Sequence, residues 1–129
     1  MKRTIVFVFL LIAIITFSHR SGEARVAIPE ITSPSNNSVF PSNTTAVTIS
    51  WSVPSNAETF VVRAKDITDP SLRLAGNNCP GNPFYLCKTI TTSQIALPVI
   101  PGHAYQFRVN GCTATSCGRA ARVDFSVLP

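Results

Sequence analysis

Short runs of alternating apolar and polar residues, broken every few positions by turn-forming residues, fill the chain from Val26 onward. In AVTISWSV (residues 46–53), Val47, Ile49 and Trp51 share one side, and ETFVVRAKD (residues 58–66) keeps the same period of two. That period is typical of β-strands with one buried face. Because no segment after Val26 shows helical periodicity over three turns, the sequence predicts an all-β fold.

We expect further strands at residues 88–97, 103–112 and 122–127, where Thr, Ile, Val and Phe are frequent. The Pro- and Gly-rich stretch 69–87 has room for at most a short edge strand around Leu72 to Leu74. Six or seven short strands with tight turns, in about 100 residues, predict an antiparallel β-sandwich.

The first 24 residues have the pattern of a secretory signal peptide. Two basic residues precede an apolar run from Ile5 to Phe17, and Ala24 ends a polar stretch with a small residue. The run is shorter than the about 20 apolar residues that cross a bilayer. We therefore expect residues 1–24 to be removed and residues 25–129 to form one domain; a retained signal anchor is the alternative.

The formal net charge of +5 falls to +3 once the leader is removed, because the leader holds three Lys or Arg residues and one Glu. Mild basicity in a secreted domain is a poor indicator of nucleic-acid binding. We expect no nucleic-acid partner, and contact with a membrane only through the signal peptide.

All four cysteines, Cys79, Cys87, Cys112 and Cys117, lie after the leader. An even number in a small exported domain favours two disulfides. The gaps of seven and four residues, with His103 as the one histidine after the leader, do not fit the usual zinc spacings. We expect disulfides, no metal and no cofactor.

The segment VIPGHAY (residues 99–105) resembles the Leu-x-Pro-Gly-x-x-Tyr corner of fibronectin type III domains, with Val99 in the leucine place. TISWSVP matches the family's second-strand tryptophan at Trp51, and AYQFRVNGC resembles its Tyr-x-Val-x-Val-x-Ala strand. The resemblance covers nearly all of residues 25–129. An immunoglobulin domain proper fits less well, since its tryptophan lies on the third strand and its cysteines bridge the two sheets.

The resemblance implies a seven-stranded antiparallel sandwich with Trp51, Tyr105 and Phe107 in the core. The Tyr105 hydroxyl would then bond backbone a few residues upstream. Cys112 would end the sixth strand and Cys117 begin the seventh, so that these two pair across a hairpin and Cys79 pairs with Cys87. Pairing of Cys87 with Cys112 remains a rival, because the layout places both at one pole.

No catalytic motif is visible among the acidic residues after the leader. We expect Asp66 and Asp69 to form turns rather than to bind calcium. We expect His103 to be a surface turn residue without a partner. The chain is therefore not expected to be an enzyme.

Fibronectin type III domains usually mediate interactions, so the resemblance implies a secreted binding or adhesion module for an extracellular protein or glycan. The alternatives are a structural component of an extracellular or envelope assembly, and a small secreted inhibitor. Strand alternation predicts a basic outer sheet face, and thus a possible anionic ligand, with the side chains of Arg63, Lys65, Arg108 and Arg122.

A second candidate surface is one pole of the sandwich. There we expect the turn after the second strand, the Cys79 to Cys87 loop and the Cys112 to Cys117 loop to meet. The apolar triplet Phe84, Tyr85 and Leu86 would either anchor a ligand there or fold under as a lid. Asn36 and Asn43 lie in N-glycosylation sequons in segments expected at the surface.

Overall fold

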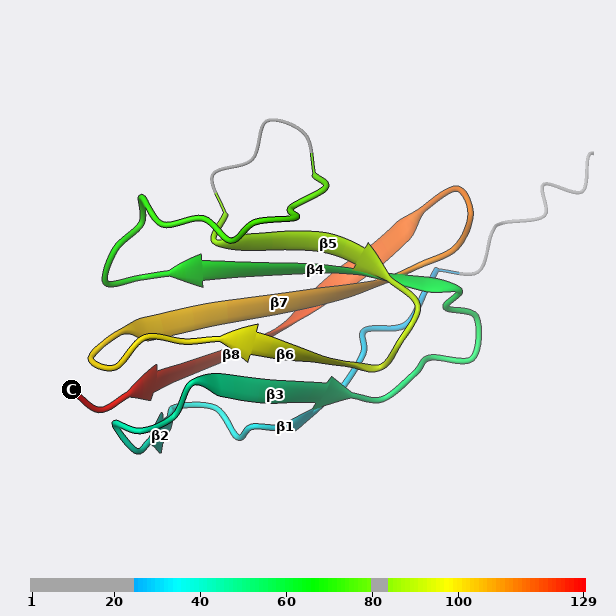
Figure 1. The fold of residues 1–129 in the computed structure, drawn as a ribbon. Coiled ribbons are helices and arrows are strands. Elements are labelled where there is room, and N and C mark those ends of the chain that lie inside the picture. The colour runs from blue at the N-terminus through cyan, green and yellow to red at the C-terminus, as the bar shows by residue number, and fades with distance from the viewer. Residues whose placement is uncertain (1–24, 80–83) are drawn as a thin grey trace, which may run out of the picture.

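The computed structural model describes residues 25–79 and 84–129, which form eight strands in two sheets (Figure 1). One sheet has the order β1-β3-β6, with bounds Ile31–Ser33, Ala46–Trp51 and Gln94–Pro98. The other has the order β2-β8-β7-β4-β5, with bounds Ser38–Phe40, Cys117–Val127, Ala104–Cys112, Thr59–Asp66 and Leu86–Ile90. All pairs are antiparallel except β2 with β8. None of the described residues belongs to a helix long and apolar enough to cross a membrane.

The strand count differs from the expected seven because two segments change sheets. The first edge strand is divided at Pro34, which offers no N–H to a ladder, into β1 in one sheet and β2 in the other. The single strand expected at residues 88–97 is likewise two strands, β5 and β6, joined by polar residues 91–93. Residues 72–74, a candidate edge strand, contain no strand.

Alternating residues of both sheets fill one core. Trp51, Tyr105 and Phe107 lie in it, and the Trp51 ring packs against Phe60 and Phe107 with centroids 5.6 and 5.9 Å apart. The Ile100 N–H donates to the Tyr105 hydroxyl at 2.9 Å, which ties the turn before β7 to the core. The aromatic ring pairs of Trp51 add to the stability that burial of these side chains already supplies.

The loop between β4 and β5 covers the free edge of β5. The Leu74 N–H donates to the Tyr85 carbonyl at 2.8 Å, and the side-chain oxygens of Asn77 and Asn78 accept from the N–H groups of Cys87 and Thr89 at 3.0 and 3.3 Å. Covering an edge in this way blocks pairing with another chain. This five-stranded sheet therefore has one of its two edges closed.

The loops lie at two different poles, contrary to expectation. Thr59 of β4 faces Cys112 of β7, so the turn before β4 and the loop 113–116 share a pole. The β4–β5 loop, which contains Cys79, starts from the opposite pole, where β4 ends at Asp66 beside Tyr105 (Figure 1). In an antiparallel sheet the connections that leave opposite ends of one strand cannot meet.

Candidate binding surface

Three arginines form a row across three neighbouring strands of the five-stranded sheet. Arg63 of β4 faces Arg108 of β7, and Arg108 faces Arg122 of β8. Because the residues before and after each arginine point into the core, all three side chains lie on the outer face. Lys65 follows two residues after Arg63 along β4 and therefore lies on the same face. We call Arg63, Lys65, Arg108 and Arg122 the basic row.

The arginines of the basic row differ in their hydrogen-bond and ion-pair partners. Arg122 forms an ion pair with Asp124 at 2.7 Å, which raises the pKa of Arg122. The Gln106 amide, turned so that its oxygen meets the guanidinium, also accepts from Arg122 at 3.0 Å. Arg63 donates to the Asn110 side chain at 3.2 Å. Arg108, which lies exposed in the middle of the row, has no hydrogen bond or ion pair with any described residue.

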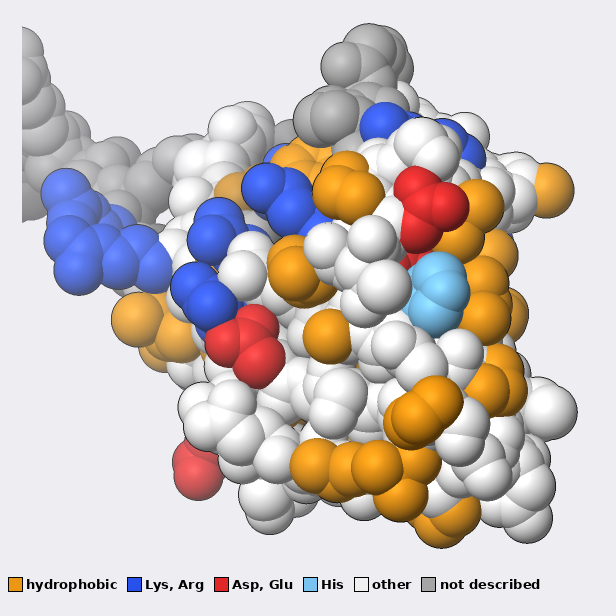
Figure 2. Space-filling model, turned by 90° about the vertical axis from the view of Figure 1, so that its left-hand side faces the viewer, with side chains coloured by type: hydrophobic (Ala, Val, Ile, Leu, Met, Phe, Trp, Pro, Cys, Tyr) orange, Lys and Arg blue, Asp and Glu red, His pale blue; other side chains and the backbone are white. Residues whose placement is uncertain are grey.

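Phe84 lies on the same face beside the basic row. The Arg63 guanidinium carbon is 5.9 Å from the centre of its ring, and the Lys65 ammonium is 5.4 Å from it. Cations at such distances are attracted by the electron-rich face of the ring. Phe84 therefore holds two of the four cations in place. Figure 2, which looks at the pole where β4 ends, shows Lys and Arg side chains gathered along its left and upper part.

The other two residues of the apolar triplet 84–86 are not on a surface. Tyr85 and Leu86 are buried, with 4% and 3% of their surface exposed. The Tyr85 hydroxyl donates to the Pro98 carbonyl at 2.9 Å, and its ring packs against Tyr105. Burial, followed by the nearby Asp66 charge, raises the pKa of Tyr85. Tyr85 and Leu86 thus form the lid that the sequence offered as the alternative to a ligand site.

Two disulfides link Cys79 to Cys87 and Cys112 to Cys117. Cys112 and Cys117 face each other at the ends of β7 and β8, with Cα atoms 4.0 Å apart. Cys87 lies opposite Arg63 on the outer face of β5, so its bridge holds the β4–β5 loop against that face. The rival bridge between Cys87 and Cys112 is not formed.

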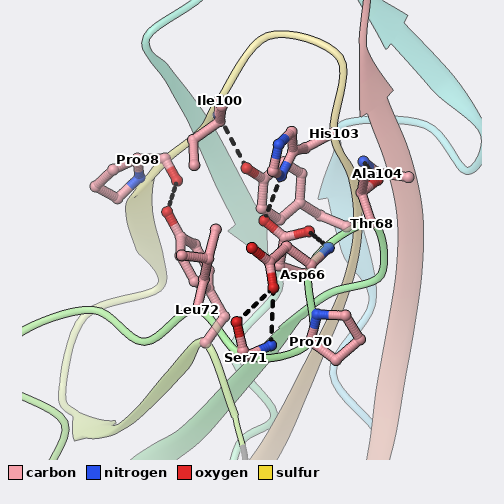
Figure 3. Close-up of polar contacts among 12 residues, drawn as sticks. Asp66, Thr68, Pro70, Ser71, Leu72, Pro98, Ile100, His103 and Ala104 are labelled. Atoms are coloured by element: carbon pink, nitrogen blue, oxygen red, sulfur yellow. Dashed lines mark hydrogen bonds and ion pairs between the residues drawn. The ribbon is translucent and has the colours of Figure 1, made fainter.

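His103 has a partner, contrary to expectation. Its Nδ1 lies 2.8 Å from Oδ2 of Asp66, whose side chain is completely buried (Figure 3). The other carboxylate oxygen of Asp66 accepts from the Asp69 N–H at 2.8 Å, and Asp69 accepts from the Ser71 N–H and hydroxyl at 3.1 and 2.6 Å. Both aspartates therefore form turns, as the sequence indicated, and these bonds from Ser71 lower the pKa of Asp69.

This pairing could have been found from the strand order alone. Asp66 ends one strand and His103 precedes its antiparallel neighbour, so the sandwich layout places the two side by side. No group of three or more metal-ligating side chains occurs in residues 25–79 and 84–129. The nearby Ser71 hydroxyl donates to the Asp69 carboxylate at 2.6 Å, a contact within the turn after β4. Asp66 and His103 join this turn to the turn before β7.

The two sequon asparagines differ in their surroundings. The Asn36 side-chain oxygen accepts from the Asp124 N–H at 2.9 Å and so extends the pairing of β2 with β8. Asn43 is exposed within the turn that the Thr44 N–H closes by donating to the Pro41 carbonyl at 3.0 Å. The expected leader falls in residues 1–24, outside the described residues.

No protein-family model matches this sequence, and no curated protein matches it. Solved structures do resemble the fold. An Fn3-like protein from Clostridium thermocellum has a TM-score of 0.53 and 15% identity, covering 82% of this chain and 97% of that one. The fn3 domain of human collagen alpha-1(XX) chain has a TM-score of 0.57 and 12% identity, covering 86% and 93%. FN3tt has a TM-score of 0.51 and 9% identity, covering 80% and 98%.

The two sheets, their strand order and these likenesses define an immunoglobulin-like β-sandwich. Within that class, the chain has the fibronectin type III fold. Domains of this fold are typically non-enzymatic scaffolds, and the fold with two disulfides is compatible with an extracellular location.

Proposed function

We propose that this protein is a secreted, non-enzymatic binding module that takes an anionic extracellular ligand on its basic row. The signal-like leader and the two disulfides support secretion. The observation that carries the ligand class is Arg108, an exposed arginine between two other arginines with no partner among the described residues.

The row of arginines lowers the stability of the sheet, so the needs of folding do not explain it. Like charges directly opposite on neighbouring strands destabilise a sheet. Two such contacts, Arg63 with Arg108 and Arg108 with Arg122, follow each other across the face, and Asp124 neutralises only the outer one. An anion above Arg108 would relieve both contacts and supply the hydrogen-bond acceptors that its guanidinium lacks.

Neighbouring strands are about 4.8 Å apart, so the three guanidinium groups can meet three successive anionic groups of a polymeric ligand. Phe84 restrains Arg63 and Lys65, which lowers the ordering cost of binding. Exposed charges interact through water and ions, so the affinity will fall steeply as salt rises.

The test compares two variants that lose the same charge. Arg108→Thr removes the centre of the row, and Arg73→Thr removes an exposed arginine of the β4–β5 loop that lies outside the row. We expect the wild type and Arg73→Thr to be retained at low salt on a sulfated polysaccharide and on immobilised polyglutamate. Arg108→Thr should elute from both at clearly lower salt. Equal elution of the two variants, or no retention of the wild type, would refute the proposed function.

A further inference from the structure

The second edge of the five-stranded sheet is only partly covered. The strand β2 pairs with Phe125 to Val127 of β8, and β8 begins at Cys117, so most of its length extends beyond β2. At its beginning, Gly118 lies against the backbone of Val26, and a Cβ at this glycine would collide with the Val26 carbonyl. Between these two contacts lies a stretch of β8 around Ala120 and Arg122.

The hydrogen bonds on either side show which way the backbone groups in this stretch point. The Asp124 carbonyl accepts from the Asn37 N–H at 2.7 Å, away from β7, while the Val127 N–H donates toward β7, to His103, at 2.9 Å. Backbone groups alternate along an antiparallel strand. The N–H and C=O groups of Ala120 and Arg122 therefore face the same side as those of Asp124, away from β7.

These backbone groups have no hydrogen-bond partner among the described residues, and both residues are exposed. Their register with Asn110 and Arg108 is regular, and the irregularity in the ladder begins only beyond Asn110. The open edge, which we define as the outward backbone of Ala120 to Arg122, thus retains strand geometry. It contrasts with the edge of β5, which Asn77 and Asn78 close.

We infer that an extended acidic polypeptide segment of a partner protein adds to this open edge as a further strand. The inference rests on the proposed function, because the basic row supplies the charge that selects the partner. A residue opposite Arg122 on the added strand would continue the line from Arg63 through Arg108 to Arg122. An acidic side chain there meets Arg122 across strands, a pairing that stabilises sheets.

The two ends of the open edge differ in charge and so favour one register. Arg119 and Arg25 line a recess beside Gly118, whereas Asp124 lies at the other end. The same recess contains Ile28, which is 53% exposed. Because side chains of a strand alternate between faces, the fitting segment has acidic residues on the side of the basic row and apolar residues on the other.

A polysaccharide could occupy the basic row but cannot form the backbone ladder, and this difference gives the test. The probes are a ten-residue peptide of alternating Glu and Val, the same peptide N-methylated at alternate residues, and a sulfated oligosaccharide. Amide hydrogen exchange is measured on the whole secreted domain. We expect the Ala120 and Arg122 amides to exchange rapidly in the free domain and to become protected by the unmodified peptide alone.

A variant gives an independent readout. Ala120→Pro removes the outward N–H of an exposed edge position and leaves every charge in place. It should weaken binding of the unmodified peptide about tenfold, and leave retention on the sulfated resin unchanged. A thermal unfolding measurement shows whether the Ala120→Pro variant folds. If the variant does not fold, the exchange measurement on the wild type alone tests the added strand.

The outcomes separate this inference from the proposed function. If retention on anionic resins depends on Arg108 but the Ala120 and Arg122 amides stay unprotected by the peptide, the ligand lies on the face and the added strand is refuted. Equal affinity for the N-methylated peptide, or slow exchange of both amides in the free domain, refutes it as well. If neither resin retains the wild type, the proposed function is refuted, and so is the selection of an acidic strand by the basic row.

Discussion

The carboxylate of Asp66 and the imidazole of His103 lie 2.8 Å apart, with the Asp66 side chain completely buried and 20% of the His103 side chain exposed. Asp66 ends β4, and His103 lies in the turn that the Tyr105 hydroxyl also holds through Ile100. This contact joins the start of the β4–β5 loop to the turn before β7 (Figure 3). A buried carboxylate that loses one of its hydrogen bonds is costly.

His103→Ala should therefore lower the free energy of unfolding by about 1 to 3 kcal/mol, measured by urea denaturation at neutral pH. Asp69→Ala, which removes a turn bond at a partly exposed position, is the comparison and should cost less. If His103→Ala is as stable as the wild type, the imidazole does not satisfy the buried carboxylate in solution.

The two tyrosines of the chain, Tyr85 and Tyr105, give a direct readout of the core at high pH. Burial is the main reason that the pKa of each hydroxyl lies above its usual value. Unfolded tyrosines release their protons near pH 10, before the folded ones do. Since the unfolded state then binds fewer protons, the stability that these groups contribute is complete below about pH 10 and is lost as the pH rises further.

Absorbance of the phenolate should accordingly appear at higher pH in the folded protein than in guanidinium chloride. Tyr85→Phe should remove about half of the delayed signal. A folded protein whose two tyrosines titrate together near pH 10 would place both hydroxyls in water.

Much of this fold could be predicted from the chain because its strands alternate and its Pro-Gly-x-x-Tyr corner is local. Trp51, Tyr105 and the hairpin of Cys112 with Cys117 depend on neighbours along one or two strands. The sequence does not reveal the switch from β5 to β6, because KTITTSQIAL has strand-forming residues throughout and only the polar residues 91–93 mark the change of sheet. Composition does not say which sheet a strand joins.

The candidate site was predictable where it follows from strand alternation and not where it depends on a long loop. Alternation placed Arg63, Arg108 and Arg122 on one face, and the register then aligned them. The position of Tyr85 depends on the route of the β4–β5 loop, which returns along β5 through bonds from Asn77 and Asn78. A long loop has many routes of similar local preference, so tertiary contacts decide among them.

Each disulfide should contribute a similar modest amount to stability. Both loops are short, with sequence separations of 8 and 5, and the chain-entropy model assigns about 2 to 3 kcal/mol to each. Replacing Cys112 and Cys117 together by serine should lower the free energy of unfolding by that amount. The Cys79 and Cys87 double variant should also increase amide exchange at Thr89, since the loop would hold the β5 edge less firmly. Unchanged exchange at Thr89 would contradict this role of the bridge.

Arg108 should reduce stability while it enables binding, and one variant can show both effects. Arg108→Thr removes two like-charge contacts across strands and introduces a good strand former, so we expect a gain of about 0.2 to 1 kcal/mol at low salt. The gain should shrink, though not vanish, in 1 M salt, because exposed charges are screened there. Arg73→Thr, outside the basic row, should show no such salt-dependent gain. Urea denaturation at two salt concentrations measures both variants, and the same samples go onto the polyglutamate resin. If Arg108→Thr is less stable than the wild type at low salt, the arginine supports the sheet, and the physical argument for an anionic ligand on the basic row is lost.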